Sequence, residues 1–190
     1  PIIRKYTEDR RSIAVYDLKT LQLVYNYQLK DENIRATYTS NSKFYCVGDD
    51  IYEIDFPKTI KTLPLTEDFE KTLEVPIVQE LNNAFFVVSK FSNYYYTYKE
   101  NQLTKKKFNS SFDFIQNLAI IDNSPWLCTP NGIIKYENEK ATTYFSDYNV
   151  SYIFKDKQQN YWISTVNSGL LFIQDFKNNF IPLFPKPTIF

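Results

Sequence analysis

Short β-prone segments led by an aromatic residue recur along this chain at intervals of about 40 residues. The clearest copy spans residues 150–173 and predicts three strands, at 151–154, 161–165 and 170–173, separated by polar turns. A sheet of four such short strands is too small to bury both of its faces, so it must stack on neighbouring copies. The recurrence therefore predicts an all-β chain of β-propeller blades, each made of four antiparallel strands.

The register of the copies is set by an aromatic residue near the start of the second strand. Trp162 leads the clearest copy, and counting back 36 residues gives Trp126. Two further steps of 41 residues give Phe85 and Phe44. We interpret these four residues as structural repeat anchors. The two tryptophans are expected to pack between successive blades rather than to serve as sugar-stacking platforms, because a buried Trp contributes a large apolar area.

The other strands of each copy follow at consistent offsets from the anchor. The third strands are expected at residues 51–54, 94–98, 133–136 and 170–173. The first strands are expected at 34–39, 75–80, 114–120 and 150–154, and the outer strands at 59–65, 103–108, 141–145 and 179–184. Gly132 and Gly169 precede two of the third strands, where a tight turn favours a positive φ. Pro182 falls in the last outer strand, which suits a sheet edge because proline cannot donate to the ladder.

The copies divide the chain into about five blades within a single propeller segment, residues 1–190. The blades are expected at residues 1–29 (incomplete, with strands near 2–6, 12–16 and 21–29), 30–69, 70–110, 111–147 and 148–184, with 185–190 as a tail or connector. A short helical candidate at 66–73 is interpreted as a loop with one turn. The segment is either a slice of a larger propeller array or a complete ring closed by its C-terminal tail. The three prolines between 182 and 187 favour the slice, since they suit a connector.

The composition excludes most kinds of reactive site. The chain contains no histidine, which rules out Ser-His-Asp and Cys-His relays and histidine-ligated zinc within it. Its three glycines form no phosphate-binding loop. The adjacent acids Asp49-Asp50 and Glu67-Asp68 lie in turn-like contexts, where Asp favours the backbone geometry itself. We therefore expect no catalytic residue, no cofactor and no metal site, and predict that this segment is not an enzyme.

Charge and hydropathy limit the partners. The formal net charge is zero, from 22 basic and 22 acidic residues, which predicts no nucleic-acid binding. No apolar run approaches the roughly 20 residues needed to span a bilayer, so we expect no direct membrane insertion by this segment. The lysine run at 105–107 is interpreted as a solvated loop rather than a phosphate-binding patch. Cys46 and Cys128 occupy the same slot in blades two apart, which predicts two buried free thiols.

The copy at 150–173 resembles the two-component regulator propeller repeat, whose pattern is Asp-x-x-Gly-x-x-Trp-Ile/Val-Gly-Thr followed by a glycine turn and an apolar strand. The matching residues here are Asp156, Trp162, Ile163, Thr165, Gly169 and Leu170. Gln159 and Ser164 stand where the family has glycine. We expect Asp156 to hold the turn before the second strand by side-chain to backbone hydrogen bonds rather than to act as a catalytic acid.

The copy at 126–136 keeps part of the same pattern. Trp126, Thr129 and Gly132-Ile133 match it, and Cys128 replaces a glycine. The two earlier copies keep only aromatic and apolar character. The resemblance therefore covers about 65 residues by motif and the rest of the chain by period alone.

The resemblance implies a role in signalling. Such repeats form the extracytoplasmic sensor of membrane histidine kinases and hybrid two-component regulators, especially in Bacteroides-like bacteria, and several respond to oligosaccharides. This implies a non-catalytic, ligand-binding signal-input module in the periplasm, part of a membrane-anchored protein that forms a homodimer, with an oligosaccharide or another small molecule as ligand. A propeller-fold glycosidase or lyase and a protein-interaction scaffold remain as alternatives.

The run Tyr94-Tyr95-Tyr96 supplies the candidate ligand contacts. Successive side chains of a strand point to opposite faces, so at least one of these rings must look outward or toward a neighbouring blade.

Overall fold

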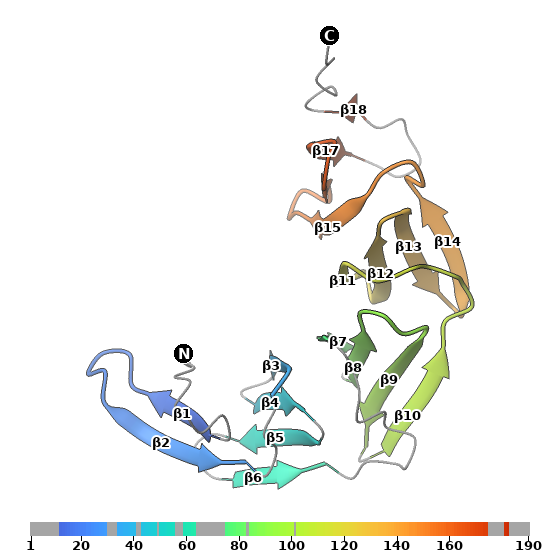
Figure 1. The fold of residues 1–190 in the computed structure, drawn as a ribbon. Helices are drawn as coiled ribbons and strands as arrows, with labels where there is room; N and C mark the ends of the chain where they lie inside the picture. The colour runs from blue at the N-terminus through green and yellow to red at the C-terminus, as the bar shows by residue number, and fades with distance from the viewer. Residues whose placement is uncertain are drawn as a thin grey trace. The chain divides into compact units, whose positions relative to one another are not determined.

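The computed structural model describes residues 12–29, 34–40, 43–48, 50–55, 59–63, 75–82, 84–100, 102–174 and 181–182. All regular secondary structure in these residues is β (Figure 1), in one two-stranded and four four-stranded sheets. The strand pairings that define these sheets are antiparallel. The predicted all-β chain of four-stranded blades is thereby confirmed. No helix in the described part of the chain has the length and apolarity to span a membrane.

The chain divides into two compact units, of which the first comprises residues 1–76 and 100–103. The described residues of this unit form a hairpin and a four-stranded sheet: β1 (Ser12–Tyr16), β2 (Leu23–Gln28), β3 (Ala36–Ser40), β4 (Lys43–Val47), β5 (Ile51–Asp55) and β6 (Thr59–Thr62). Side chains of both sheets form one buried cluster, with Ile13 and Leu29 from the hairpin region against Phe44, Cys46 and Ile54.

The second unit comprises residues 77–99 and 104–190 and holds three four-stranded sheets. The first sheet is formed by β7 (Pro76–Leu81), β8 (Ala84–Ser89), β9 (Tyr94–Lys99) and β10 (Gln102–Lys107). The second is formed by β11 (Asn117–Ile121), β12 (Ser124–Thr129), β13 (Gly132–Glu137) and β14 (Lys140–Tyr144). The third is formed by β15 (Val150–Lys155), β16 (Tyr161–Thr165), β17 (Leu170–Ile173) and β18 (Ile181–Pro182), with Pro182 in the edge strand.

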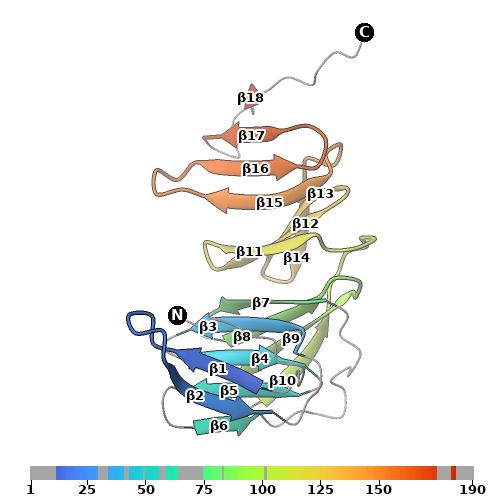
Figure 2. The same cartoon turned by 60° about the vertical axis from the view of Figure 1, so that its left-hand side comes forward.

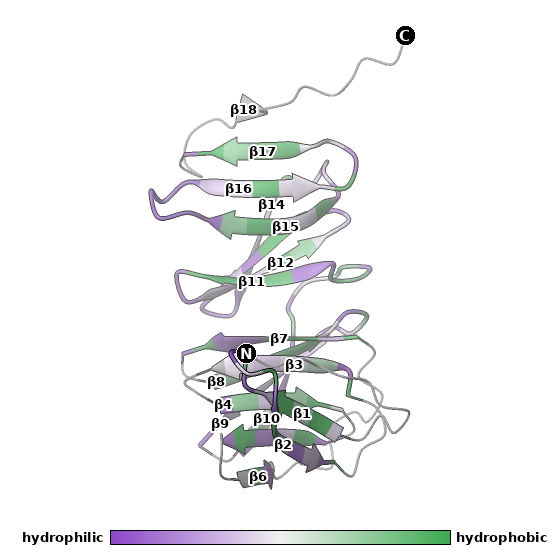
Figure 3. Cartoon of the chain, turned by 90° about the vertical axis from the view of Figure 1, so that its left-hand side faces the viewer, coloured by the Kyte–Doolittle hydropathy of each residue, from purple (hydrophilic) through white to green (hydrophobic). Residues whose placement is uncertain are grey.

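A single strand of the middle sheet serves two cores, because its side chains alternate between two faces. Leu127 of β12 belongs to the cluster shared with the β7–β10 sheet. Trp126 and Cys128, its neighbours in sequence, belong to the cluster shared with the β15–β18 sheet. Figure 2 shows β15, β16 and β17 side by side in that sheet, and Figure 3 shows the apolar residues on these strands and the hydrophilic β15–β16 turn. Stacking thus supplies the burial that no single sheet of this size provides.

The observed strands follow the predicted ones closely, with two instructive differences. The third strands agree to within one residue at each end. Strand β11 begins three residues later than expected, because the amide of Ile115 bonds to the carbonyl of Lys90 (2.8 Å) instead of joining the ladder. The lysine run at 105–107 lies in strand β10, which agrees with the outer strand expected at 103–108, so the separate interpretation of this run as a loop was wrong. The expected helical turn at 66–73 and strand at 2–6 lie outside the described residues.

Candidate functional site

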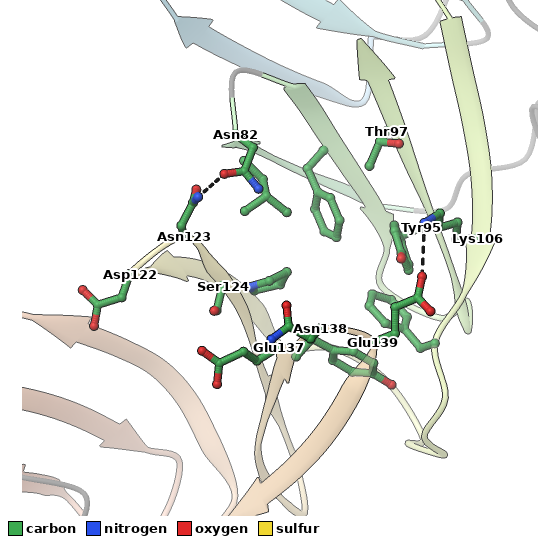
Figure 4. Close-up of a pocket in the computed structure, with 15 residues that line it drawn as sticks. Asn82, Tyr95, Thr97, Lys106, Asp122, Asn123, Ser124, Glu137, Asn138 and Glu139 are labelled. Atoms are coloured by element: carbon green, nitrogen blue, oxygen red, sulfur yellow. Dashed lines mark hydrogen bonds and ion pairs between the residues drawn. The ribbon is translucent and has the colours of Figure 1, made fainter.

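A cavity of about 450 Å³ lies in the second unit, between the β7–β10 and β11–β14 sheets (Figure 4). Its lining comes from strands β7 to β10 of one sheet, from β12 and β13 of the other, and from the turns that follow β7, β11 and β13. The volume falls within the range of about 300–1,000 Å³ that is usual for sites of small ligands.

Two tight hairpin turns position the polar side chains on one wall. Asp122 and Asn123 connect β11 to β12 with φ values of 49° and 62°, and Asn138 and Glu139 connect β13 to β14 with 50° and 63°. Two consecutive residues with positive φ form the type I′ turn that matches the twist of a hairpin. Asp and Asn tolerate this geometry well, whereas Glu139 adopts it at some cost in backbone strain. The turns place Asn123 and Glu139 opposite the β7–β10 sheet.

The opposite wall is aromatic. The ring of Tyr95 lies between those of Phe86 and Phe108, with centroid distances of 5.0 and 4.7 Å. Phe108 also contacts Tyr136 from the facing sheet at 4.9 Å, so the ring cluster joins the two walls. Burial raises the pKa of the Tyr95 hydroxyl, which therefore remains a neutral donor and acceptor at physiological pH.

Each carboxylate of the lining has a lysine partner. Glu139 Oε1 lies 3.4 Å from Lys106 Nζ, Glu137 Oε2 lies 2.8 Å from Lys135 Nζ, and Asp122 Oδ2 lies 2.6 Å from Lys155 Nζ. The hydrogen bonds to Glu137 and Asp122 are the main cause of the raised pKa values of Lys135 and Lys155, which keep their charge. Among the described residues, no group of three or more His, Cys, Asp or Glu side chains could hold a metal ion.

Neutral polar groups complete the lining. The side-chain amide of Asn123 donates a hydrogen bond to Oδ1 of Asn82, across the two sheets. Ser124 begins β12, is only 5% exposed and lines the cavity. A hydroxyl in a cavity wall can bond a ligand, because it can both donate and accept a hydrogen bond.

The three tyrosines predicted as ligand contacts separate by face. Tyr95 lines the cavity with Thr97, two residues later in β9. Tyr94 and Tyr96 do not line it, and the ammonium of Lys105 lies 4.5 and 5.8 Å from their ring centroids. Tyr96 is completely buried. The alternation of the strand therefore leaves one of the three candidates in the cavity.

The four anchors all lie in the second strand of their sheets, but they do not share one face. Phe44 packs in the cluster with the preceding hairpin, whereas Trp126 packs in the cluster with the following sheet. Phe44 in β4, Phe85 in β8 and Trp126 in β12 are buried. Trp162 in β16 is only half-buried, because its ring points to the face opposite the core formed with β11–β14. That face also carries the exposed rings of Tyr152 and Phe154.

The remaining predicted positions shape turns. Asp156 Oδ1 accepts a hydrogen bond from the backbone amide of Asn160 (2.9 Å) in the β15–β16 turn. Gly132 and Gly169 have φ values of 99° and 76°. Their carbonyls accept hydrogen bonds from the hydroxyls of Thr129 (2.9 Å) and Thr165 (2.8 Å), so the Thr–Gly turn is repeated in two sheets. None of these residues lines the cavity.

Sequence reasoning missed most of the cavity, including Asn82, Asn123, Ser124 and Glu139. One signal was present: Asn82 and Asn123 are 41 residues apart, the step that also separates Phe85 from Trp126. Equivalent turns of successive blades lie near one another, so polar residues repeated at that step were candidates for a shared site.

The comparisons with known proteins concern the fold. No protein-family model and no curated protein sequence matches the chain. A solved streptogramin B lyase matches 94% of the chain with a TM-score of 0.68 and 11% identity. The virginiamycin B lyase from Staphylococcus aureus, solved with quinupristin as a catalytically inactive variant, matches 95% of it with a TM-score of 0.68 and 14% identity. The chain spans 63% and 64% of the length of these two lyases.

Extracellular domains of signalling proteins match as well. The domain described as that of the hybrid two-component system BT3049 from B. thetaiotaomicron matches 84% of the chain with a TM-score of 0.59 and 18% identity. The domain of BT4673 from the same organism matches 86% with a TM-score of 0.60 and 16% identity. The chain spans 24% and 25% of the length of these domains. At these identities the likeness shows the fold alone, which is of the propeller type.

Proposed function

We propose that this chain belongs to the extracytoplasmic signal-input region of a membrane-anchored two-component regulator, where it binds an oligosaccharide and catalyses no reaction. The observation that carries the proposal is the cavity between two successive sheets, whose polar groups are amides, hydroxyls and carboxylates already paired with lysines. The resemblance of residues 126–136 and 150–173 to the two-component regulator repeat supports the sensor role. So does the fold shared with extracellular domains of the B. thetaiotaomicron systems.

A propeller-fold glycosidase or lyase is the alternative. Glycoside cleavage uses a carboxylic acid with a raised pKa and a second carboxylate beside the scissile bond. Each of the three acids in the cavity lining is instead engaged in an ion pair with a lysine. The inactive S. aureus lyase variant has an alanine in place of a histidine, and this chain contains no histidine. These observations favour binding over turnover.

Ligand binding would signal through the sheets that it touches. A ligand in the cavity contacts both the β7–β10 and the β11–β14 sheet and stabilises the arrangement in which both contacts are made. In a paired sensor, that preference shifts the equilibrium between arrangements of the two copies and is passed to the membrane anchor.

The test is a binding and turnover assay with the full 190-residue chain. We expect one class in a panel of oligosaccharides to give saturable heat in calorimetry and to raise the melting temperature, since a ligand that binds only the native state stabilises it. We also expect chromatography to recover that saccharide unchanged. Cleavage products would establish the enzyme alternative, and the absence of binding across the panel would overturn the proposed ligand class.

A further inference from the structure

Two interactions bridge the sheets on either side of the cavity. The amide hydrogen bond between Asn123 and Asn82 is one bridge, and the ion pair between Lys106 and Glu139 is the other. Figure 4 shows them on opposite sides of the space that Ser124 and the aromatic side chains line. A molecule in this space contacts both sheets through groups that already form bonds across the junction.

The side chains that line that space include more acids than lysines. Asp122, Glu137 and Glu139 line the cavity with one lysine, Lys106, so the lining carries a formal charge of −2 (three acids less one lysine). Lys135 and Lys155, the partners of two of the acids, are not in the lining. A carboxylate paired with a lysine still accepts a hydrogen bond from a hydroxyl group, whereas an anionic ligand finds these lysines already engaged.

We infer that the cavity binds one unit of a neutral oligosaccharide and selects against uronate and sulfated sugars. The inference rests on the proposed function, to which it adds the site and the chemical class of the ligand. Sugar hydroxyls both donate and accept, so they match the hydroxyls of Tyr95 and Ser124 and the amides of Asn82 and Asn123. The partly exposed side chains of Leu81, Tyr95 and Pro125 in the lining offer apolar surface to the face of a pyranose ring.

The test uses matched variants of the full chain. Tyr95→Phe removes one hydroxyl and keeps the ring, and Ser124→Ala removes the other hydroxyl with little change in volume. Tyr94→Phe is the control, because Tyr94 is the preceding residue of the same strand and lies outside the cavity. The probes are gluco-, xylo- and manno-tetrasaccharides, with an oligogalacturonate tetrasaccharide as the acidic counterpart. Melting temperatures without ligand show whether each variant is folded.

We expect a neutral probe to bind the wild type more tightly than the acidic one. Tyr95→Phe and Ser124→Ala should each weaken binding about three- to tenfold, the loss expected for one neutral hydrogen bond, while Tyr94→Phe binds like the wild type. Glu139→Gln should narrow the difference in binding affinity between the neutral and the acidic probes, because it removes one negative charge.

Three results would overturn the inference. If a neutral probe binds but both cavity variants bind like the wild type, the site is wrong and the proposed function stands. A preference for the oligogalacturonate would overturn the charge argument alone. If none of the four probes binds, the inference fails together with the proposed ligand class.

Discussion

The indole Nε1 of Trp162 donates a hydrogen bond of 2.9 Å to Oδ2 of Asp156, six residues earlier in the chain. This bond is the largest contribution to the lowered pKa of Asp156, which the bonds from Asn160 lower further. The equivalent Trp126 instead donates to the backbone carbonyl of Ile121 at 3.3 Å. The turn before Trp126 has only two residues, and its carboxylate, Asp122, is paired with Lys155.

The Asp156 interaction predicts a pH dependence of stability. Because the pKa is lower in the folded state, the carboxylate stabilises the fold above the unfolded pKa of about 4, and this contribution is lost as the pH falls through the folded value. We expect Asp156→Asn to lower the melting temperature at pH 7. The melting temperatures of the variant and the wild type should converge as the pH falls below the folded pKa of Asp156. Circular dichroism melts at several pH values measure this. Asp113→Asn, at an exposed position, is the control. If Asp156→Asn lowered the melting temperature by the same amount at every pH, the ionisation of Asp156 would not be the cause.

Gly132 is predicted to tolerate alanine less well than Gly169. Both have a positive φ, which costs a non-glycine residue roughly 1–3 kcal/mol. At Gly132 an added Cβ would also lie 2.4 Å from the carbonyl oxygen of Tyr144 and 2.9 Å from that of Phe145, which are backbone atoms. We expect Gly132→Ala to lower the free energy of unfolding clearly more than Gly169→Ala in urea titrations. Equal losses would show that the hairpin relaxes around the methyl group.

The two tryptophans are predicted to contribute unequally to stability. Trp126 is 3% exposed and contacts Tyr144 and Tyr161 at 5.9 and 5.8 Å between two sheets, whereas Trp162 is only half-buried. Trp126→Ala should cost about 3–5 kcal/mol of unfolding free energy, the range for large buried aromatic side chains. Trp162→Ala should lower the unfolding free energy by a smaller amount, because less of the Trp162 side chain is buried in the folded protein. Guanidinium titrations compare the two, and a larger loss at Trp162 would show that its exposed face is covered in solution.

The cysteines are predicted to be free and protected. Cys46 and Cys128 are both completely buried, and neither is in a disulfide. Burial raises the pKa of Cys128 to about 12, so almost no reactive thiolate exists at pH 8. A disulfide reagent should react slowly with the native chain and titrate two thiols after unfolding without reductant. The Cys128→Ser variant should have one titratable thiol after unfolding. If the unfolded wild type had no free thiol, the structure would be contradicted.

Where the strands lie was readable from the amino-acid sequence, because the alternation and turn residues that define a strand are local. The third strands at β5, β9, β13 and β17 agree with prediction to within one residue. The Thr–Gly turns are also local features, because their hydrogen bonds join residues only three or four positions apart in the sequence. These features depend on neighbouring residues and need no knowledge of the packing.

Only the tertiary structure decided which faces are covered and which side chains meet. Trp126 and Trp162 share a motif, yet one is buried and the other half-exposed, since burial depends on the sheet that packs against each. Asn82 and Asn123 meet across 41 residues, and of the three tyrosines only Tyr95 lines the cavity. These outcomes follow from the stacking of one sheet on the next, which brings together residues that local sequence preferences do not relate.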